Sequence, residues 1–232
     1  MLFRDRRQAG RELAEELLEV QAGGALPDPV VLALPRGGVA VAREVARALD
    51  APLDVLVVRK IGAPHHEEYG VGALVGEEDP LYDGAALDRL GLGPEDLAPV
   101  VERERTELRR RERRYRQGRP APEVRGRTVI VVDDGLATGS TARAALRALR
   151  RQGPARTVLA VPVGSPEAAE ALNAEADLVV CPYRPDTFMA VGQWYEDFEQ
   201  LTDEDVLEAL EAGKAREAER TGGRQGLPGG SL

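Results

Sequence analysis

Hydrophobic residues along this chain gather into short runs that alternate with segments of helical spacing. The runs lack polar alternation, which is typical of strands buried on both faces of a parallel sheet. They predict strands at 30–34, 55–58, 71–75, 128–132, 157–161 and 178–181. Helical spacing predicts helices at 3–22, 39–49, 141–151 and 166–173. This order indicates an α/β fold with a mainly parallel sheet of five or six strands flanked by helices.

A long charged insertion at 94–119 separates the third and fourth predicted strands. Pro94 suits the first turn of a helix, and we expect that helix to run to about Gln117. Residues 213–232 are rich in glycine and charge, which predicts a disordered tail. The sequence therefore predicts a single domain over 1–212.

The composition excludes several classes of protein. The chain has 232 residues, a net charge of −9 and one cysteine, Cys181. The negative charge argues against a general nucleic-acid binder, and a lone cysteine excludes a disulfide framework and fits a reducing compartment. No run approaches the ~20 apolar residues of a membrane helix, and the first residues become charged at once, unlike a secretory signal. We therefore expect a soluble, cytoplasmic protein that binds no membrane.

The most informative segment is 128–141, which reads Thr-Val-Ile-Val-Val-Asp-Asp-Gly-Leu-Ala-Thr-Gly-Ser-Thr. A predicted strand ends at Asp133 and Asp134, and a short glycine-containing loop leads into a helix. Amides that converge at a helix N-terminus bind phosphate, and neighbouring hydroxyls add donors. The acid pair can only accept hydrogen bonds when ionised, so it suits the hydroxyls of a ribose diol. The segment predicts a site for a phosphorylated sugar, whereas simple helix capping needs only one of the two aspartates.

The same segment resembles the 5-phosphoribosyl-1-diphosphate (PRPP) motif of the type I phosphoribosyltransferases. The resemblance covers the hydrophobic run, the paired acids and Ala-Thr-Gly-Ser-Thr, with one departure at Gly135, where the family more often has an aliphatic residue. It implies a phosphoribosyltransferase-type sheet, a homodimer and a C-terminal hood segment, here within 182–200. It also implies that the 5-phosphate binds to Ala137, Thr138, Gly139, Ser140 and Thr141.

Two further segments supply cations. The first segment, 34–39, reads Leu-Pro-Arg-Gly-Gly-Val and forms a turn suited to binding an anion. In the resembling family this position is the pyrophosphate loop, which is formed here by Arg36, Gly37 and Gly38. Arg59 and Lys60 end the second predicted strand, where the family places a similar pair that reaches toward the diphosphate. The alternative interpretation of 34–39 is an ordinary turn, and that of Arg59 and Lys60 is a pair of solvated charges at the end of a strand.

Residues 62–68 contain both histidines, His65 and His66, and we predict a mobile loop there. The resemblance implies that this loop closes over the substrates. Glu68 opens a Glu-Tyr-Gly triplet that resembles adenine phosphoribosyltransferases, which makes it a candidate acid or base. Lys60, Glu68 and Asp134 are the predicted catalytic residues. The histidines lack carboxylate or cysteine partners at ligand spacing, so we predict no metal site built by the protein.

Aromatic residues gather in the stretch 184–198. In the resembling family the hood selects the base, which makes Phe188, Met189 and Trp194 candidate base-binding residues. A small satellite hydrophobic core explains the cluster equally well. The 6-oxopurine enzymes carry an acid where Ala137 stands, so the phosphate loop is closer to the adenine and orotate enzymes. The base is therefore left open.

The segment 102–119 contains nine arginines and four glutamates. Glu107 and Arg111 show helical spacing, which favours a solvated helix with ion pairs one turn apart. RNA contact and dimerisation are the alternatives. Because the glutamates would repel RNA phosphates, we do not expect nucleic-acid binding.

These features together predict a pentosyltransferase of nucleotide metabolism. We expect it to transfer the 5-phosphoribosyl group of PRPP to a nitrogenous base, with Mg²⁺ bridging substrate oxygens and pyrophosphate as the second product. The alternative function is a regulatory protein that senses PRPP or a nucleotide and binds RNA or a protein partner. Arg36 and Lys60 favour the enzyme, because a sensor has less need for a pyrophosphate loop.

Overall fold

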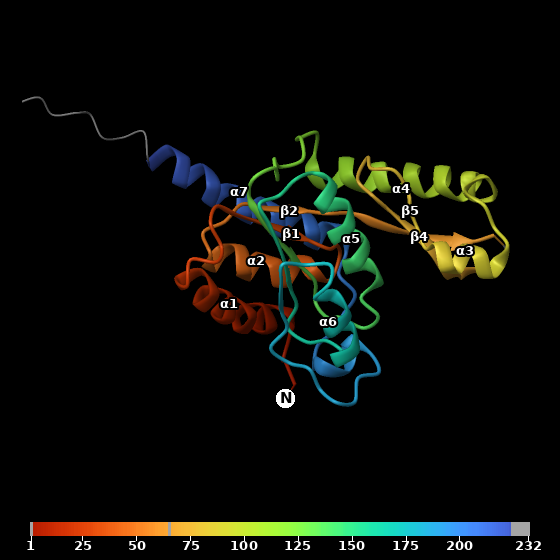
Figure 1. Cartoon of the computed structure of the whole chain (residues 1–232). Helices are drawn as coiled ribbons and strands as arrows, with labels where there is room; N and C mark the ends of the chain where they lie inside the picture. Colours follow the sequence, from red (N-terminus) through yellow and green to blue (C-terminus); the bar gives the residue numbers. More distant parts are fainter. Residues whose placement is uncertain (1, 65, 224–232) are drawn as a thin grey trace, which may run out of the picture.

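The computed structural model describes residues 2–64 and 66–223. At its centre lies a five-stranded parallel sheet with the strand order β2-β1-β6-β7-β8 (Figure 1). Its strands are β1 (Pro29–Ala33), β2 (Leu53–Val55), β6 (Thr128–Val132), β7 (Arg156–Ala160) and β8 (Leu178–Val180). The predicted α/β fold with a parallel sheet is confirmed.

Helices cover both faces of this sheet because successive strand side chains point to opposite faces. On one face, Val31 and Ala33 pack with α1 (Arg6–Ala22), α2 (Gly38–Ala48) and α7 (Asp203–Gly223). On the other, Val30 and Leu32 pack with α5 (Ser140–Arg151) and α6 (Pro166–Leu172). Strands buried on both sides explain the uninterrupted hydrophobic runs in the sequence.

A second, three-stranded antiparallel sheet projects from the first (Figure 1). It consists of β3 (Val58–Ala63), β4 (His66–Val75) and β5 (Leu81–Tyr82). It is accompanied by α3 (Gly84–Leu90), the 3₁₀ helix η1 (Pro94–Leu97) and α4 (Ala98–Arg116). The predicted charged helix in the insertion is thus α4.

Two sequence predictions fail at this sheet. The run 55–58, predicted as one strand, is divided, because β2 ends at Val55 and β3 begins at Val58. The stretch 62–68, predicted as a mobile loop, includes the paired ends of the β3–β4 hairpin, where Ala63 pairs with His66. Gly62 allows the two strands to approach, because a side chain there would collide with the backbone of Glu67.

The strand order places a topological switch point between β1 and β6, and we use the term crevice for the region outside the carboxyl ends of these two strands. The two strands are hydrogen-bonded neighbours, yet the chain leaves β1 toward β2 and leaves β6 toward β7 in the opposite direction. The intervening helices, α2 and α5, lie on opposite faces of the sheet. Open α/β sheets bind ligands at such a switch point, outside the carboxyl ends of the strands.

The C-terminal segment also differs from its prediction. Helix α7 continues to Gly223, so 213–223 is helical where the composition predicted a disordered tail. Alanine, glutamate, lysine and arginine dominate 214–220, and these are strong helix formers. The last predicted tail residues, 224–232, lie outside the described residues. Of the helices in the described ranges, none combines the length and hydropathy that crossing a bilayer requires.

Candidate functional site

Two loops meet at the crevice between β1 and β6. The first follows β1 and contains Arg36, Gly37 and Gly38, and the second follows β6 and begins with the acid pair Asp133 and Asp134. A Cβ atom on Gly38 would lie 2.7 Å from the carbonyl oxygen of Val132 and 2.8 Å from the Asp133 Cα, and one on Gly37 would collide with the Asp134 carboxylate. The glycines therefore let the first loop lie directly against the acid pair.

The second loop presents a row of backbone N–H groups. Gly139 adopts a left-handed conformation with φ of 73°, and α5 begins at the next residue. Within the described ranges, the N–H groups of Ala137, Thr138 and Gly139 meet no protein acceptor. The side chains of Thr138 and Ser140 are exposed beside them, with their hydroxyl oxygens 3.2 Å apart. Open amides at a helix N-terminus are suited to an anion such as phosphate.

The acid pair is held in place by its neighbours. Asp133 accepts a hydrogen bond from the Asp134 N–H at 2.9 Å. Asp134 Oδ2 accepts from Arg6 Nε at 2.8 Å, in an ion pair whose two side chains are only 9% and 14% exposed. The Tyr195 hydroxyl donates to the Asp134 carbonyl at 2.5 Å. Burial, followed by the negative charge of Asp134, raises the pKa of Asp133 well above its usual value.

This raised pKa gives a testable pH dependence. An acid whose pKa is higher in the folded than in the unfolded protein stabilises the fold below its unfolded pKa, and this contribution is lost as the pH rises through the folded pKa. We therefore expect Asp133→Asn to raise the melting temperature by a few degrees at pH 8 and to change it little at pH 4. Calorimetry at both pH values measures this. An equal change in melting temperature at both pH values would contradict a raised pKa of Asp133 in the folded protein.

Arg36 lies where α4 and α7 approach the first loop. Its Nη1 is 3.9 Å from Asp203 Oδ1, and Asp203 is the first residue of α7. The same Asp203 oxygen accepts from the buried Tyr115 hydroxyl at 2.7 Å. Burial, reinforced by this hydrogen bond, raises the pKa of Tyr115 to about 12. Asp203 therefore holds Arg36 near the crevice with its side chain one-third exposed.

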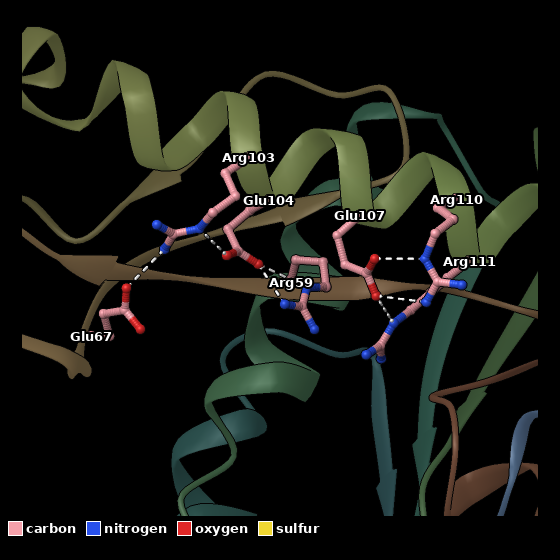
Figure 2. Close-up of polar contacts among 7 residues, drawn as sticks. All are labelled: Arg59, Glu67, Arg103, Glu104, Glu107, Arg110 and Arg111. Carbon is pink, nitrogen blue, oxygen red and sulfur yellow. Dashed lines mark hydrogen bonds and ion pairs between the residues drawn. The ribbon is translucent and has the colours of Figure 1, made fainter.

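Arg59 forms an ion pair with a residue of α4. Its Nε and Nη2 donate to Oε2 of the buried Glu104 on α4, at 2.9 and 2.5 Å. Figure 2 shows this pair continuing through Arg103 to Glu67 of β4. Lys60, the next residue, is exposed on the opposite face of β3. In this structure Arg59 therefore faces α4, and diphosphate binding by either residue stays a prediction.

The arginine-rich helix forms ion pairs within the molecule. Figure 2 shows Glu107 accepting from Arg110 and Arg111, and these hydrogen bonds lower the pKa of Glu107 to about 2. The spacing of Glu107 and Arg111 is thus confirmed as an ion pair one turn apart. Other α4 arginines that pair with carboxylates are Arg103, Arg109, Arg114 and Arg116. Such pairing supports the interpretation of α4 as a helix whose arginines form ion pairs, both within the helix and with carboxylates of other segments.

The hood forms a small hydrophobic core. Tyr195 is buried with Phe3, Ala9 and Val163, and Phe188 and Trp194 pack against this cluster. The rings of Phe188 and Trp194 stack on each other with centroids 6.3 Å apart, while Met189 is 84% exposed. The satellite core that was one of the two interpretations is therefore present. A contact between these three residues and a base stays a prediction.

The departure at Gly135 also has a structural reason. A side chain at this position would collide with Val191 of the hood. Val191 therefore occupies the space that an aliphatic residue at 135 would need. This close contact places the hood directly against the second loop.

The geometry described above agrees with a comparison of the sequence to protein families. Residues 4–198 match the family model described as "Phosphoribosyl transferase domain". The chain belongs to this family. The match includes both loops at the crevice, the acid pair and the hood up to Phe198.

Individual relatives of this phosphoribosyl transferase domain agree with the assignment. The protein "Putative phosphoribosyl transferase Rv0571c" of Mycobacterium tuberculosis is 44% identical over 216 residues, which cover 90% of this chain and 46% of that protein. The chain thus spans about half the length of the curated relatives it matches. The crystal structure of TT1426 from Thermus thermophilus is 48% identical, covers 90% of this chain and 98% of its own, and superposes with a TM-score of 0.78.

One predicted site residue of this phosphoribosyl transferase domain, Glu68, has its side chain outside the described residues, although its backbone belongs to β4. His65 also lies outside the described residues. Among the described side chains, no three carboxylate, histidine or cysteine groups gather into a metal cage. The role of Glu68 as an acid or base stays a prediction.

Four residues at or near the site were missed from the sequence: Arg6, Glu104, Tyr195 and Asp203. Arg6 belongs to a charged run at the start of the chain, and nothing in that run separates it from its neighbours. Glu104 was interpreted as solvated but is buried. Tyr195 lies in the aromatic stretch, which could have drawn attention to it. Each of the four acts through a partner distant in sequence, which no local pattern reveals.

Proposed function

We propose that this protein transfers the 5-phosphoribosyl group of PRPP to a nitrogenous base and releases pyrophosphate. The observation that carries the proposal is the row of open amides at 137–139 beside the acid pair, at the switch point of the sheet. Donors for a phosphate next to acceptors for hydroxyls match the two ends of a phosphorylated ribose. Membership of the phosphoribosyl transferase domain family supports the same substrate class.

The proposed placement of PRPP is based on the charges of the predicted site residues. The 5-phosphate binds the amides and hydroxyls of 137–141, and the ribose hydroxyls donate to Asp133 and Asp134. The diphosphate lies toward Arg36 and Lys60. Arg59 contacts the diphosphate only if its ion pair with Glu104 breaks. The base would bind toward the hood, where the rings of Phe188 and Trp194 stack on each other.

The proposed reaction needs little covalent help from the protein. Breaking the bond between ribose C1 and the diphosphate oxygen develops positive charge on the ring and negative charge on the leaving group. Arg36 counters the negative charge, and the acid pair lies close to the positive one. Holding the base and C1 in register while countering these charges accounts for most of the expected rate. Exclusion of water from the site would protect PRPP from hydrolysis.

Magnesium would enter with PRPP. The acid pair offers the oxygen ligands that Mg²⁺ prefers, but Asp134 is already engaged by Arg6. Mg²⁺ usually keeps several waters and binds through substrate phosphates, so we propose that diphosphate and ribose oxygens hold most of it. Bound there, the ion would neutralise charge on the leaving diphosphate.

The phosphate loop can be tested with a small change. Thr138→Ala removes an exposed hydroxyl without leaving a cavity, so we expect roughly three- to tenfold weaker PRPP binding and an unchanged melting temperature. Isothermal titration with PRPP and MgCl₂ measures the affinity. Thr106→Ala, at an exposed position on α4, is the matched control and should bind PRPP like the wild type. Equal affinities for the two variants would count against the loop.

The activity itself is tested by incubating the protein with PRPP, MgCl₂ and each of a panel of purine and pyrimidine bases. We expect pyrophosphate release that depends on one class of base, which would also identify the acceptor. A regulatory protein would bind PRPP without releasing pyrophosphate and would retain RNA in a salt-sensitive manner. That pair of results would contradict the proposed transferase. The homodimer and the cytoplasmic location stay predictions.

A further inference from the structure

We propose that Arg6 is a positioning residue that fixes the Asp134 carboxylate for ribose binding and links it to the hood. The inference rests on the proposed PRPP-dependent function, and Arg6 lies outside every motif singled out in the sequence. Arg6 stands in the first turn of α1, 128 positions before Asp134, yet its Nε donates to Asp134 Oδ2 at 2.8 Å. The pair joins the first helix of the chain to the end of the central strand β6.

The Arg6 guanidinium makes three contacts that use different parts of the group. Nε donates to Asp134, and Nη1 donates to the Glu199 carbonyl at 2.9 Å. Cζ lies over the Phe198 ring, 3.9 Å from the ring centroid. A planar guanidinium can make two directed hydrogen bonds and a stacking contact at once, whereas a lysine ammonium cannot. The arrangement therefore requires arginine rather than any cation.

The Asp134 carboxylate is clamped from two sides. Arg6 holds Oδ2, and the backbone of Gly37 presses so closely that a Cβ atom there would collide with the same oxygen. A carboxylate has about four lone-pair positions, so one N–H from Arg6 leaves acceptor capacity for hydroxyls. The contacts with Arg6 and Gly37 therefore fix the direction in which the free lone pairs of the Asp134 carboxylate point.

The hood is tied to the same pair. The Tyr195 hydroxyl donates to the Asp134 carbonyl, and Glu199 and Phe198 contact Arg6. Residues before α1 run alongside the hood, because the Phe3 N–H donates to the Trp194 carbonyl and the Phe3 carbonyl accepts from the Glu196 N–H, both at 2.8 Å. Figure 1 shows the start of the chain next to the hood. The hood therefore contacts Asp134 directly through Tyr195 and indirectly through Arg6.

A structural ion pair elsewhere in the chain provides a matched control. Arg116 on α4 donates to Asp54 of β2 at 3.1 Å, with side chains 12% and 9% exposed. This pair is as buried as that of Arg6 and Asp134, but neither residue belongs to the crevice loops. Arg116→Lys therefore measures how the loss of a buried guanidinium changes stability when the crevice loops are not altered.

The experiment is isothermal titration of PRPP with MgCl₂ into the wild type, Arg6→Lys, Arg116→Lys, Asp134→Asn and the double variant Arg6→Lys/Asp134→Asn, with melting temperatures alongside. We expect Arg6→Lys to weaken PRPP binding about tenfold and Arg116→Lys to leave it unchanged. Because Arg6 acts through Asp134, the double variant should bind no more weakly than Asp134→Asn alone. If Arg6→Lys does not fold, Phe198→Leu removes the stacking contact and should weaken binding about threefold.

The outcomes separate this inference from the proposed function. A wild type that does not bind PRPP contradicts the proposed function. A wild type that binds PRPP, with Arg6→Lys or Phe198→Leu within twofold of it, overturns the role of Arg6 and leaves the proposed function standing. Equal weakening by Arg6→Lys and Arg116→Lys, or additive losses in the double variant, would also overturn that role.

Discussion

Asp134→Asn is expected to weaken PRPP binding by about ten- to a hundredfold, because hydrogen bonds that involve a charged group contribute roughly 1.5–3 kcal/mol. Asparagine keeps the shape of the side chain but removes the negative charge that ribose hydroxyls and Arg6 both contact. The buried Arg6 also loses its charged partner, so we expect a lower melting temperature. Titration calorimetry with PRPP and MgCl₂, together with thermal unfolding, measures both effects.

A second aspartate separates binding from stability in this experiment. Asp54→Asn removes the carboxylate of an equally buried arginine pair, that of Asp54 and Arg116. We expect a comparable fall in melting temperature and an unchanged affinity for PRPP. If Asp54→Asn and Asp134→Asn weaken PRPP binding equally, the loss reflects stability alone, and the assignment of Asp134 to the ribose is wrong.

Gly38→Ala is expected to disturb the site through the backbone. The added Cβ would lie 2.7 Å from the Val132 carbonyl oxygen and 2.8 Å from the Asp133 Cα, and neither atom can turn away as a side chain would. The first loop must then move off the acid pair. Overpacking of this kind costs about 1–3 kcal/mol, which corresponds to a fall of roughly 3–10 °C in melting temperature for a domain of this size. We expect PRPP binding to fall at least about tenfold.

Gly84→Ala is the matched control for this glycine. Gly84 is the first residue of α3, its φ is not positive, and a Cβ there would meet no atom within 4 Å. Alanine is favoured over glycine in a helix by about 0.5–1 kcal/mol, so this variant should be as stable as the wild type or slightly more stable. A Gly38→Ala variant that behaves like Gly84→Ala would show that the two loops are not in close contact.

The parts of the fold that the sequence predicted correctly are local. The strand and the helix that flank the acid pair lie in one contiguous segment, 128–151, so one segment carries the whole pattern. The pairing of Glu107 with Arg111 is likewise a matter of spacing within one helix. The parallel sheet could be inferred because strands buried on both faces leave uninterrupted hydrophobic runs.

The parts that the sequence missed depend on contacts between distant segments. Residues 53–58 are all hydrophobic except Asp54. Nothing local therefore shows that β2 ends at Val55 and that β3 belongs to another sheet. Nothing local in the sequence shows that the packing of α4 on β3 brings Glu104 to Arg59. Arg6 is linked to Asp134 by the way that α1 lies against the hood.

The central claim is that the open amides after the acid pair bind the 5-phosphate of PRPP. The most direct test follows the backbone amide signals of the ¹⁵N-labelled protein by NMR during titration with PRPP and MgCl₂. We predict saturable shifts that are largest at Ala137, Thr138, Gly139, Ser140 and Thr141, with smaller ones at Gly37 and Gly38. If the amide signals at 137–141 do not move, PRPP binds elsewhere or not at all. Either result would contradict binding of the 5-phosphate by this loop.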